Sequence, residues 1–134
     1  LYRVATAKPM KITVINRTIE KADRLIRKFG NMTKIRSEAE IDRPFDLVIN
    51  GSSAGLTGDF FPEENIPLTS KTYFYDLNYS LTETPFCKWA NEKSDYVYDG
   101  MGMLVYQAAY SFEKWFNIFP NTDKVINDLE EMRE

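Results

Sequence analysis

Short apolar runs alternate with helix-forming segments along most of this 134-residue chain. Strand-like runs, rich in β-branched and aromatic residues, occupy residues 10–15, 33–35, 45–50, 73–76 and 96–98. Helical patterns occupy residues 19–29, 84–93, 102–116 and 123 to the end. Strands that alternate with helices at this spacing predict an α/β fold, in which a parallel sheet is covered by helices on both faces.

The segment over residues 19–29 carries the clearest helix signal. Its apolar residues recur every three or four positions, Thr18 suits the N-cap, and Gly30 suits the C-terminal stop. In parallel sheets ligands bind at the carboxyl ends of the strands. The segments to inspect for a site are therefore residues 16–21, 50–55, 76–80 and 99–102.

Composition excludes several kinds of function. The net charge of -3 and pI of about 5.1 argue against nucleic acid or an anionic membrane as a partner. Cys87 is the only cysteine and there is no histidine, so neither an internal disulfide nor the usual zinc site is expected, and no metal is predicted. With no run long enough to cross a bilayer and no signal peptide, we expect a single cytoplasmic domain over residues 1–134.

A basic turn precedes the helix over residues 19–29. Arg17 and Lys21 lie where the helix dipole disfavours cations, by roughly 0.3–1 kcal/mol each, so a bound anion would offset this cost. Folds that bind NAD usually place an acidic residue at this strand end, whereas NADP requires cations for its 2′-phosphate. The turn favours NADP. The alternative is a solvated helix start whose charges are balanced by Glu20 and Asp23.

Four segments in order carry a family resemblance that runs from Lys8 to about Leu129. They are Asn16-Arg17-Thr18-x-x-Lys21-Ala22, residues 50–55, Tyr75-Asp76-Leu77-Asn78-Tyr79 with Thr84-Pro85-Phe86, and residues 99–109. Together they resemble the shikimate dehydrogenase family, and the last segment is the most specific. Gly51 and Ser52 depart from the family's commoner Ala and Thr. Glutamyl-tRNA reductases have a similar Asn-Arg-Thr turn, but not the last segment.

The resemblance implies a role for each matching residue. Around the 2′-phosphate of NADP it places Asn16, Arg17, Thr18 and Lys21. Beneath the cofactor and beside its nicotinamide it places Asn50, Gly51, Ser52, Leu77, Gly100 and Met103. Tyr79 and Gln107 would contact the substrate.

Each of these residues also has a structural interpretation. The loop over residues 50–55 can be a turn that merely needs small residues, and Tyr79 can be an aromatic packing at a strand end. Met103, Ala108 and Phe112 can belong to the core face of a helix. Gln107 can be a polar residue without a functional role on that apolar face.

The resemblance also implies what a whole family member contains. A glycine-rich loop would hold the pyrophosphate, and a Lys and Asp pair in an N-terminal substrate domain would transfer the proton. Neither is present here. We therefore expect the NADP-binding C-terminal domain of a two-domain dehydrogenase, with no catalytic residue in this chain. Its Rossmann-like, doubly wound parallel sheet would be incomplete at the N-terminal side, where residues 1–7 would represent only the end of the first helix.

Three explanations for the missing first strand stay open. Residues 1–7 are rearranged, another chain such as the second copy in a homodimer completes the sheet, or the sequence is a piece of a longer protein.

The activity implied is the reversible NADPH-dependent reduction of 3-dehydroshikimate to shikimate, in aromatic amino-acid biosynthesis. Two alternatives remain in view. One is a quinate or shikimate dehydrogenase paralogue that uses NAD, and the basic turn argues against it. The other is a non-catalytic ligand-sensing module of the same fold.

Overall fold

The computed structural model describes residues 1–32, 35–37, 43–53 and 66–133. Ala54 and Gly55 of the predicted small-residue loop, and residues 33–34 of the predicted second strand, lie outside the described residues. The chain divides into two compact units, Leu1–Arg43 and Pro44–Glu134. Whether residues 1–134 act as one domain stays a prediction.

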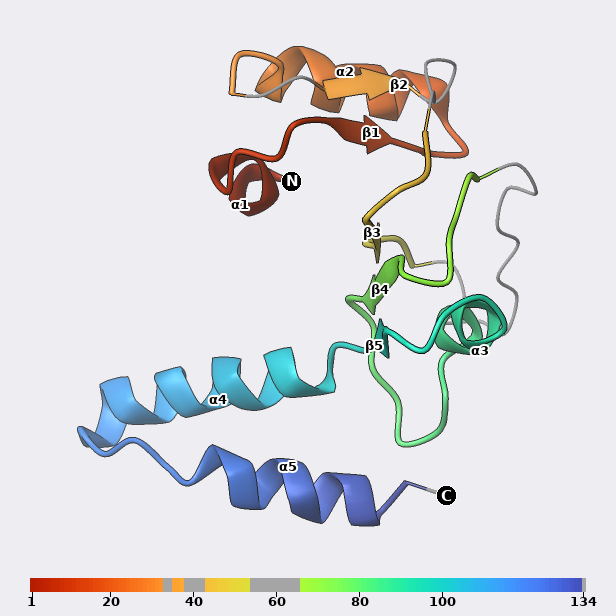
Figure 1. The fold of residues 1–134 in the computed structure, drawn as a ribbon. Coiled ribbons are helices and arrows are strands. Elements are labelled where there is room, and N and C mark those ends of the chain that lie inside the picture. Colours follow the sequence, from red (N-terminus) through yellow and green to blue (C-terminus); the bar gives the residue numbers. More distant parts are fainter. Residues whose placement is uncertain (33–34, 38–42, 54–65, 134) are drawn as a thin grey trace. The chain divides into compact units, whose positions relative to one another are not determined.

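The first unit is built around one strand–turn–helix–strand sequence (Figure 1). A short helix α1 (Tyr2–Thr6) is followed by β1 (Ile12–Val14), α2 (Ile19–Phe29) and β2 (Ile35–Ser37). The two strands pair in parallel, with Ile12 opposite Ile35. The helix has the predicted bounds and caps, with Thr18 before it and Gly30 after it. Its N-terminus therefore follows the carboxyl end of β1, as the sequence predicts.

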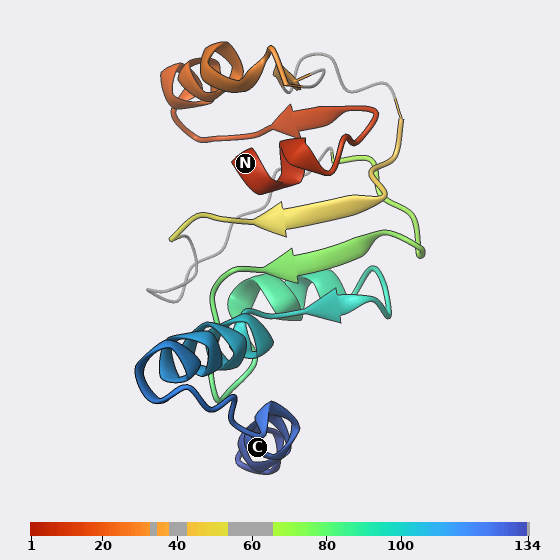
Figure 2. The ribbon, with the colours of Figure 1, turned by 90° about the vertical axis from the view of Figure 1, so that its left-hand side faces the viewer.

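The second unit contains a three-stranded parallel sheet in the order β3–β4–β5 (Figure 2). Its elements are β3 (Leu47–Asn50), β4 (Tyr73–Asp76), α3 (Pro85–Asn91), β5 (Val97–Tyr98), α4 (Met101–Phe116) and α5 (Thr122–Glu131). All the strands point the same way, so their carboxyl ends meet at one edge. Loops from that edge, and helix α4 after one of them, carry the predicted residues of this unit.

Helix α3 covers one face of this sheet. The strand register places Val48, Phe74 and Val97 on the same face. There the buried Phe74 packs against Phe86 of α3 and, edge to face at 5.6 Å between ring centres, against Trp89. The helix begins one residue after the predicted start, because Thr84 is its N-cap and the Thr84 hydroxyl accepts a hydrogen bond from the backbone N–H of Cys87. It ends at Asn91, two residues before the predicted end.

The opposite face of the same sheet carries apolar and aromatic side chains. Leu47, Ile49, Tyr73 and Tyr98 on this face are exposed. Tyr73 stacks on Tyr96, with ring centres 4.6 Å apart, so the tyrosines of this face cover one another in part.

Helices α4 and α5 lie side by side as a hairpin (Figures 1 and 2). Asn117 ends α4 in a left-handed conformation, with φ 54°, and the Asn121 side chain caps α5. Both helices begin one residue before the predicted positions. No helix in the described part of the chain is long and apolar enough to span a membrane.

Candidate functional site

The basic turn of the first unit is held together by local bonds. Asn16 Oδ1 accepts a hydrogen bond of 2.9 Å from the Thr18 N–H, and the Lys21 N–H donates to the Thr18 carbonyl at 3.0 Å. The side chains of Arg17 and Lys21 are exposed, and neither forms an ion pair within the described residues. Thr18 makes no side-chain capping bond. The turn thus presents two cations to solvent, beside a helix N-terminus.

A buried carboxylate organises the predicted loops of the second unit. Asp76, at the end of β4, is 1% exposed. Its Oδ1 accepts hydrogen bonds from Asn50 Nδ2 at 3.0 Å, from the Asn78 N–H at 3.0 Å and from Asn78 Nδ2 at 2.9 Å. Its Oδ2 accepts from the Thr84 hydroxyl at 2.8 Å. Bonds to an ionised acceptor are about twice as strong as neutral ones, so Asp76 firmly joins three segments.

The sequence motifs alone assign no functional role to Asp76, Asn78 or Thr84. The available signal was a carboxylate at the end of an apolar strand, eight residues before a Thr-Pro helix start. Such a carboxylate is rarely buried unless hydrogen bonds satisfy it.

The loop after β3 is joined to the loop after β4. Asn50 Oδ1 accepts hydrogen bonds from the N–H and hydroxyl of Ser52, and the Ser52 carbonyl accepts from Asn78 Nδ2 at 3.0 Å. A side chain at Gly51 would be 3.4 Å from Leu77 Cδ1. The structure therefore brings Asn50, Gly51, Ser52 and Leu77 together.

Gly100 has a structural reason to be glycine. A Cβ atom at this position would lie 2.5 Å from the Leu77 carbonyl oxygen and 3.0 Å from that of Asn78. The Gly100 N–H donates to the Asn78 carbonyl at 2.8 Å. Close approach of two backbone segments thus requires glycine here. This reason is independent of the prediction that Gly100 lies beside the nicotinamide of the cofactor.

The side chains of Tyr79, Met103 and Gln107 are accessible. Tyr79 is 48% exposed and Met103 is 42% exposed, while Gln107 lies one turn after Met103 on α4. Buried positions of the same helix are Met101, Val105 and Ala109. In this chain Met103, Ala108 and Phe112 are exposed, so they are not helix core. Tyr79, Met103 and Gln107 can therefore reach a ligand.

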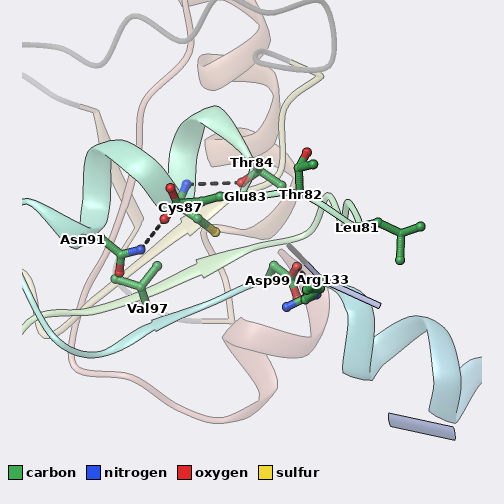
Figure 3. A pocket seen from close by; sticks show the side chains of 9 residues that line it. All are labelled: Leu81, Thr82, Glu83, Thr84, Cys87, Asn91, Val97, Asp99 and Arg133. Atoms are coloured by element: carbon green, nitrogen blue, oxygen red, sulfur yellow. Dashed lines mark hydrogen bonds and ion pairs between the residues drawn. The ribbon is translucent and has the colours of Figure 1, made fainter. Parts of the chain in front are cut away.

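A cavity of about 250 Å³ lies beside the edge strand β5 (Figure 3). Its lining comes from the loop after β4, from α3, from Val97 and Asp99, and from Arg133 after α5. None of the predicted site residues lines it. Arg133 forms an ion pair with Asp99 in this cavity, and Asn91 donates a hydrogen bond to Glu83.

Two side chains near the site have raised pKa values. Burial raises the pKa of the Cys87 thiol, and the Thr84 hydrogen bond opposes this change in part. Burial, and then the negative charge of Asp99, raise the pKa of Tyr75. Both groups are therefore protonated at neutral pH, and Cys87 is not a thiolate nucleophile. The described residues contain no cluster of carboxylate and cysteine side chains that could hold a metal ion.

Known proteins similar to this chain share one enzyme name. The family model of the shikimate 5′-dehydrogenase C-terminal domain matches residues 100–134, starting at Gly100. The shikimate dehydrogenase (NADP(+)) of Hahella chejuensis is 42% identical over 124 residues, which cover 90% of this chain and 46% of that protein. That of Actinobacillus pleuropneumoniae is 42% identical over 139 residues, which cover 100% and 50%. Along nearly its whole length, this chain is similar to shikimate dehydrogenases. It spans about half the length of the curated relatives it matches.

Solved structures confirm the Rossmann-like α/β fold of this chain. An Ael1 enzyme from Pseudomonas putida matches 96% of this chain and 48% of its own, with 34% identity and a TM-score of 0.75. The shikimate dehydrogenase of Aquifex aeolicus covers 90% of this chain and 44% of its own, with 23% identity and a TM-score of 0.63.

Proposed function

We propose that this protein acts in the reversible NADPH-dependent reduction of 3-dehydroshikimate to shikimate. The observation that carries the proposal is 42% identity along the whole chain to a relative named shikimate dehydrogenase (NADP(+)). The substrate class is therefore a small cyclic hydroxy acid, in aromatic amino-acid biosynthesis. A paralogue that prefers quinate is distinguished by its substrate rather than by its fold.

The basic turn fits the 2′-phosphate of NADP. Arg17 and Lys21 are exposed next to a helix N-terminus, where backbone N–H groups also favour an anion. Asn16 and Thr18 supply further polar groups, although Asn16 Oδ1 already accepts the Thr18 N–H. When bound, NADPH supplies the hydride, and these residues select the phosphorylated cofactor over NADH.

The second unit fits the nicotinamide end of the cofactor and the substrate. Asn50, Gly51, Ser52 and Leu77 form one wall, while Gly100 and Met103 stand at the start of α4. Tyr79 and Gln107 offer a phenol and an amide to a hydroxyl or carboxylate of the substrate. These groups orient reactants, and we assign no proton-transfer residue within this chain.

We also propose a cytoplasmic setting and a homodimer. Cys87 is a free thiol, which suits a reducing compartment. The exposed apolar sheet face of the second unit offers a surface that another chain can cover. Sedimentation of the purified protein tests the second point, since a monomer at all concentrations would contradict it.

A direct test measures shikimate-dependent formation of NADPH by its near-ultraviolet absorbance. The purified full-length protein is supplied with shikimate or quinate and with NADP or NAD. We expect reduction with shikimate and NADP, and much slower reduction with NAD. Faster turnover of quinate would support the paralogue. Tight binding of shikimate with no reduction of either cofactor would support the ligand-sensing module.

Gln107 gives a sharper test of the substrate side. Gln107→Ala should impair the use of shikimate and leave the affinity for NADPH nearly unchanged, because we assign its exposed side chain to the substrate. Steady-state kinetics separate the two effects. Glu113→Ala, an exposed change on the same helix, is the control. A normal turnover number and Michaelis constant for shikimate in Gln107→Ala would show that this residue is ordinary helix surface.

A further inference from the structure

Arg133 connects two loops that are distant in the sequence. Its Nη2 atom lies 2.5 Å from Asp99 Oδ2 and 3.3 Å from the Ser80 carbonyl oxygen. Arg133 follows the last residue of α5 by two positions, whereas Ser80 lies in the loop after β4 and Asp99 just after β5. One guanidinium group thus joins the C-terminal end of the hairpin to both loops. Figure 3 shows Arg133 beside Asp99.

Asp99 is held at both of its carboxylate oxygens. Oδ1 accepts a hydrogen bond of 3.0 Å from the Met101 N–H, at the first residue of α4. Oδ2 pairs with Arg133. The Asp99 side chain is only 14% exposed and the Arg133 side chain 33%, so solvent screens this pair less than a pair at the open surface. The planar guanidinium can also serve two acceptors at once, which a lysine does poorly.

The two loops joined by Arg133 carry the residues proposed to orient the reactants. Tyr79 directly precedes Ser80, and Gly100 directly follows Asp99. The backbone of the loops already meets through the Gly100 N–H and the Asn78 carbonyl. Arg133 adds the link that comes from outside both loops.

We infer that Arg133 is a positioning residue that holds the Tyr79 loop in register with the start of α4. The orienting part of this inference rests on the proposed function, because it assumes that Tyr79 and Met103 face the substrate and the nicotinamide. The link itself does not depend on that assumption. Arg133 acts through Asp99 and Ser80 and need not touch a ligand.

The same helix offers a matched control. Lys124 pairs with Asp128 at 2.6 Å, four residues along α5, and both side chains are largely exposed. Lys124→Ala removes one positive charge and one ion pair of the hairpin, as Arg133→Ala does, but it breaks no link between loops. Any difference between the two variants therefore reports the bridge rather than the charge.

The first measurement is amide hydrogen exchange at Met101 and Gly100, which needs no enzymatic activity. Loss of a partly buried pair should speed exchange of these amides about fivefold in Arg133→Ala. Lys124→Ala should change it less than about twofold, because exposed i,i+4 pairs contribute little. Arg133→Lys should restore part of the protection. Equal exchange in Arg133→Ala and Lys124→Ala would overturn the inference.

The second measurement is steady-state kinetics of the full-length protein. In Arg133→Ala we expect the KM for shikimate to rise about fivefold, since displacement of positioning groups weakens productive binding. The preference for NADPH over NADH should be unchanged, because the 2′-phosphate turn belongs to the other unit. An unchanged KM together with faster exchange would reduce Arg133 to a purely structural role and overturn the positioning assignment.

The two measurements separate failure of this inference from failure of the proposed function. If the unmodified protein does not turn over shikimate, the proposed function is wrong, and exchange alone then decides whether Arg133 links the loops. If it does turn over shikimate and both variants behave alike, the inference fails and the function stands.

Discussion

Two parts of the molecule are held together by bonds that span very different distances in the sequence. One is the basic turn of the first unit, and the other is the cluster of hydrogen bonds around Asp76 in the second unit. The turn depends on a bond between Asn16 and Thr18, two residues apart. The cluster depends on bonds from Asn50 and Thr84 to Asp76, across 26 and 8 residues. A local turn can lose one charged side chain and keep its shape. A long-range cluster cannot, so binding and stability should be separable in the first unit and coupled in the second.

The largest effect should come from Asp76→Asn. The substitution replaces one acceptor oxygen by an amino group. This group would face the donors of Asn50 and Asn78 or, in the other orientation of the amide, the donor of Thr84. We expect the free energy of unfolding to fall by about 3–4 kcal/mol, measured by urea denaturation. Asp95→Asn, at an exposed position of the same unit, is the control and should change it by less than about 0.5 kcal/mol. Equal midpoints for the two variants would remove the basis of the comparison.

A pair of glycines tests how closely the two loops of the second unit approach. Gly100→Ala should lower the free energy of unfolding by up to about 3 kcal/mol, because its methyl group would overlap backbone atoms that move only with their loop. Gly102, two residues on, lies inside α4, and a methyl group added there would meet no atom within 4 Å. Gly102→Ala should therefore stabilise by about 0.5–1 kcal/mol. Calorimetric melting of both variants gives the answer, and a stable Gly100→Ala protein would contradict the close approach.

The same contrast explains which parts of the structure the sequence could predict. The bounds of α2 and β4 were predicted residue for residue, because helical spacing with caps and a dense aromatic run are local signals. The strand expected from residue 45 starts instead at Leu47, since the Phe45 N–H turns away to the Pro67 carbonyl. That bond joins residues that are distant in the sequence, and no local sequence pattern predicts it.

The residues of the candidate site also differ in whether local sequence signals could predict them. The basic turn was found with a physical reason, since misplaced cations at a helix start are visible in the sequence. In the second unit the motif located Asn50 and Gly100 but not what holds them, because Asp76 and Arg133 act through partners 26 to 53 residues away. Contacts of that range depend on the packed fold. The roles of the predicted residues toward NADP and shikimate stay predictions.

In the first unit, Arg17→Ala should change binding alone. Loss of a charge-assisted phosphate contact should weaken NADPH binding by about 1.5–3 kcal/mol and leave NADH binding nearly unchanged. The free energy of unfolding should stay within about 0.5 kcal/mol, since the side chain is exposed. Binding titrations with both cofactors test this, with Arg27→Ala near the other end of α2 as control. Equal losses for NADPH and NADH would defeat the 2′-phosphate assignment.

The smallest effect concerns the buried thiol of Cys87 and should appear as a pH dependence of stability. Burial raises the pKa of Cys87, so the folded state holds its proton more tightly than the unfolded state does. Its contribution is fully present below the pKa of an unfolded thiol, about 8.5, and is lost as pH rises through the higher folded value. Urea unfolding from neutral pH to about pH 9.5 should show a steeper loss in the unmodified protein than in Cys87→Ala. The pKa of Tyr75 is also raised, but both proteins contain Tyr75, so its contribution cancels in the comparison. Parallel pH profiles for the two proteins would mean that the thiol is solvated in the folded state, against the burial of Cys87 in the core cluster with Phe74 and Phe86.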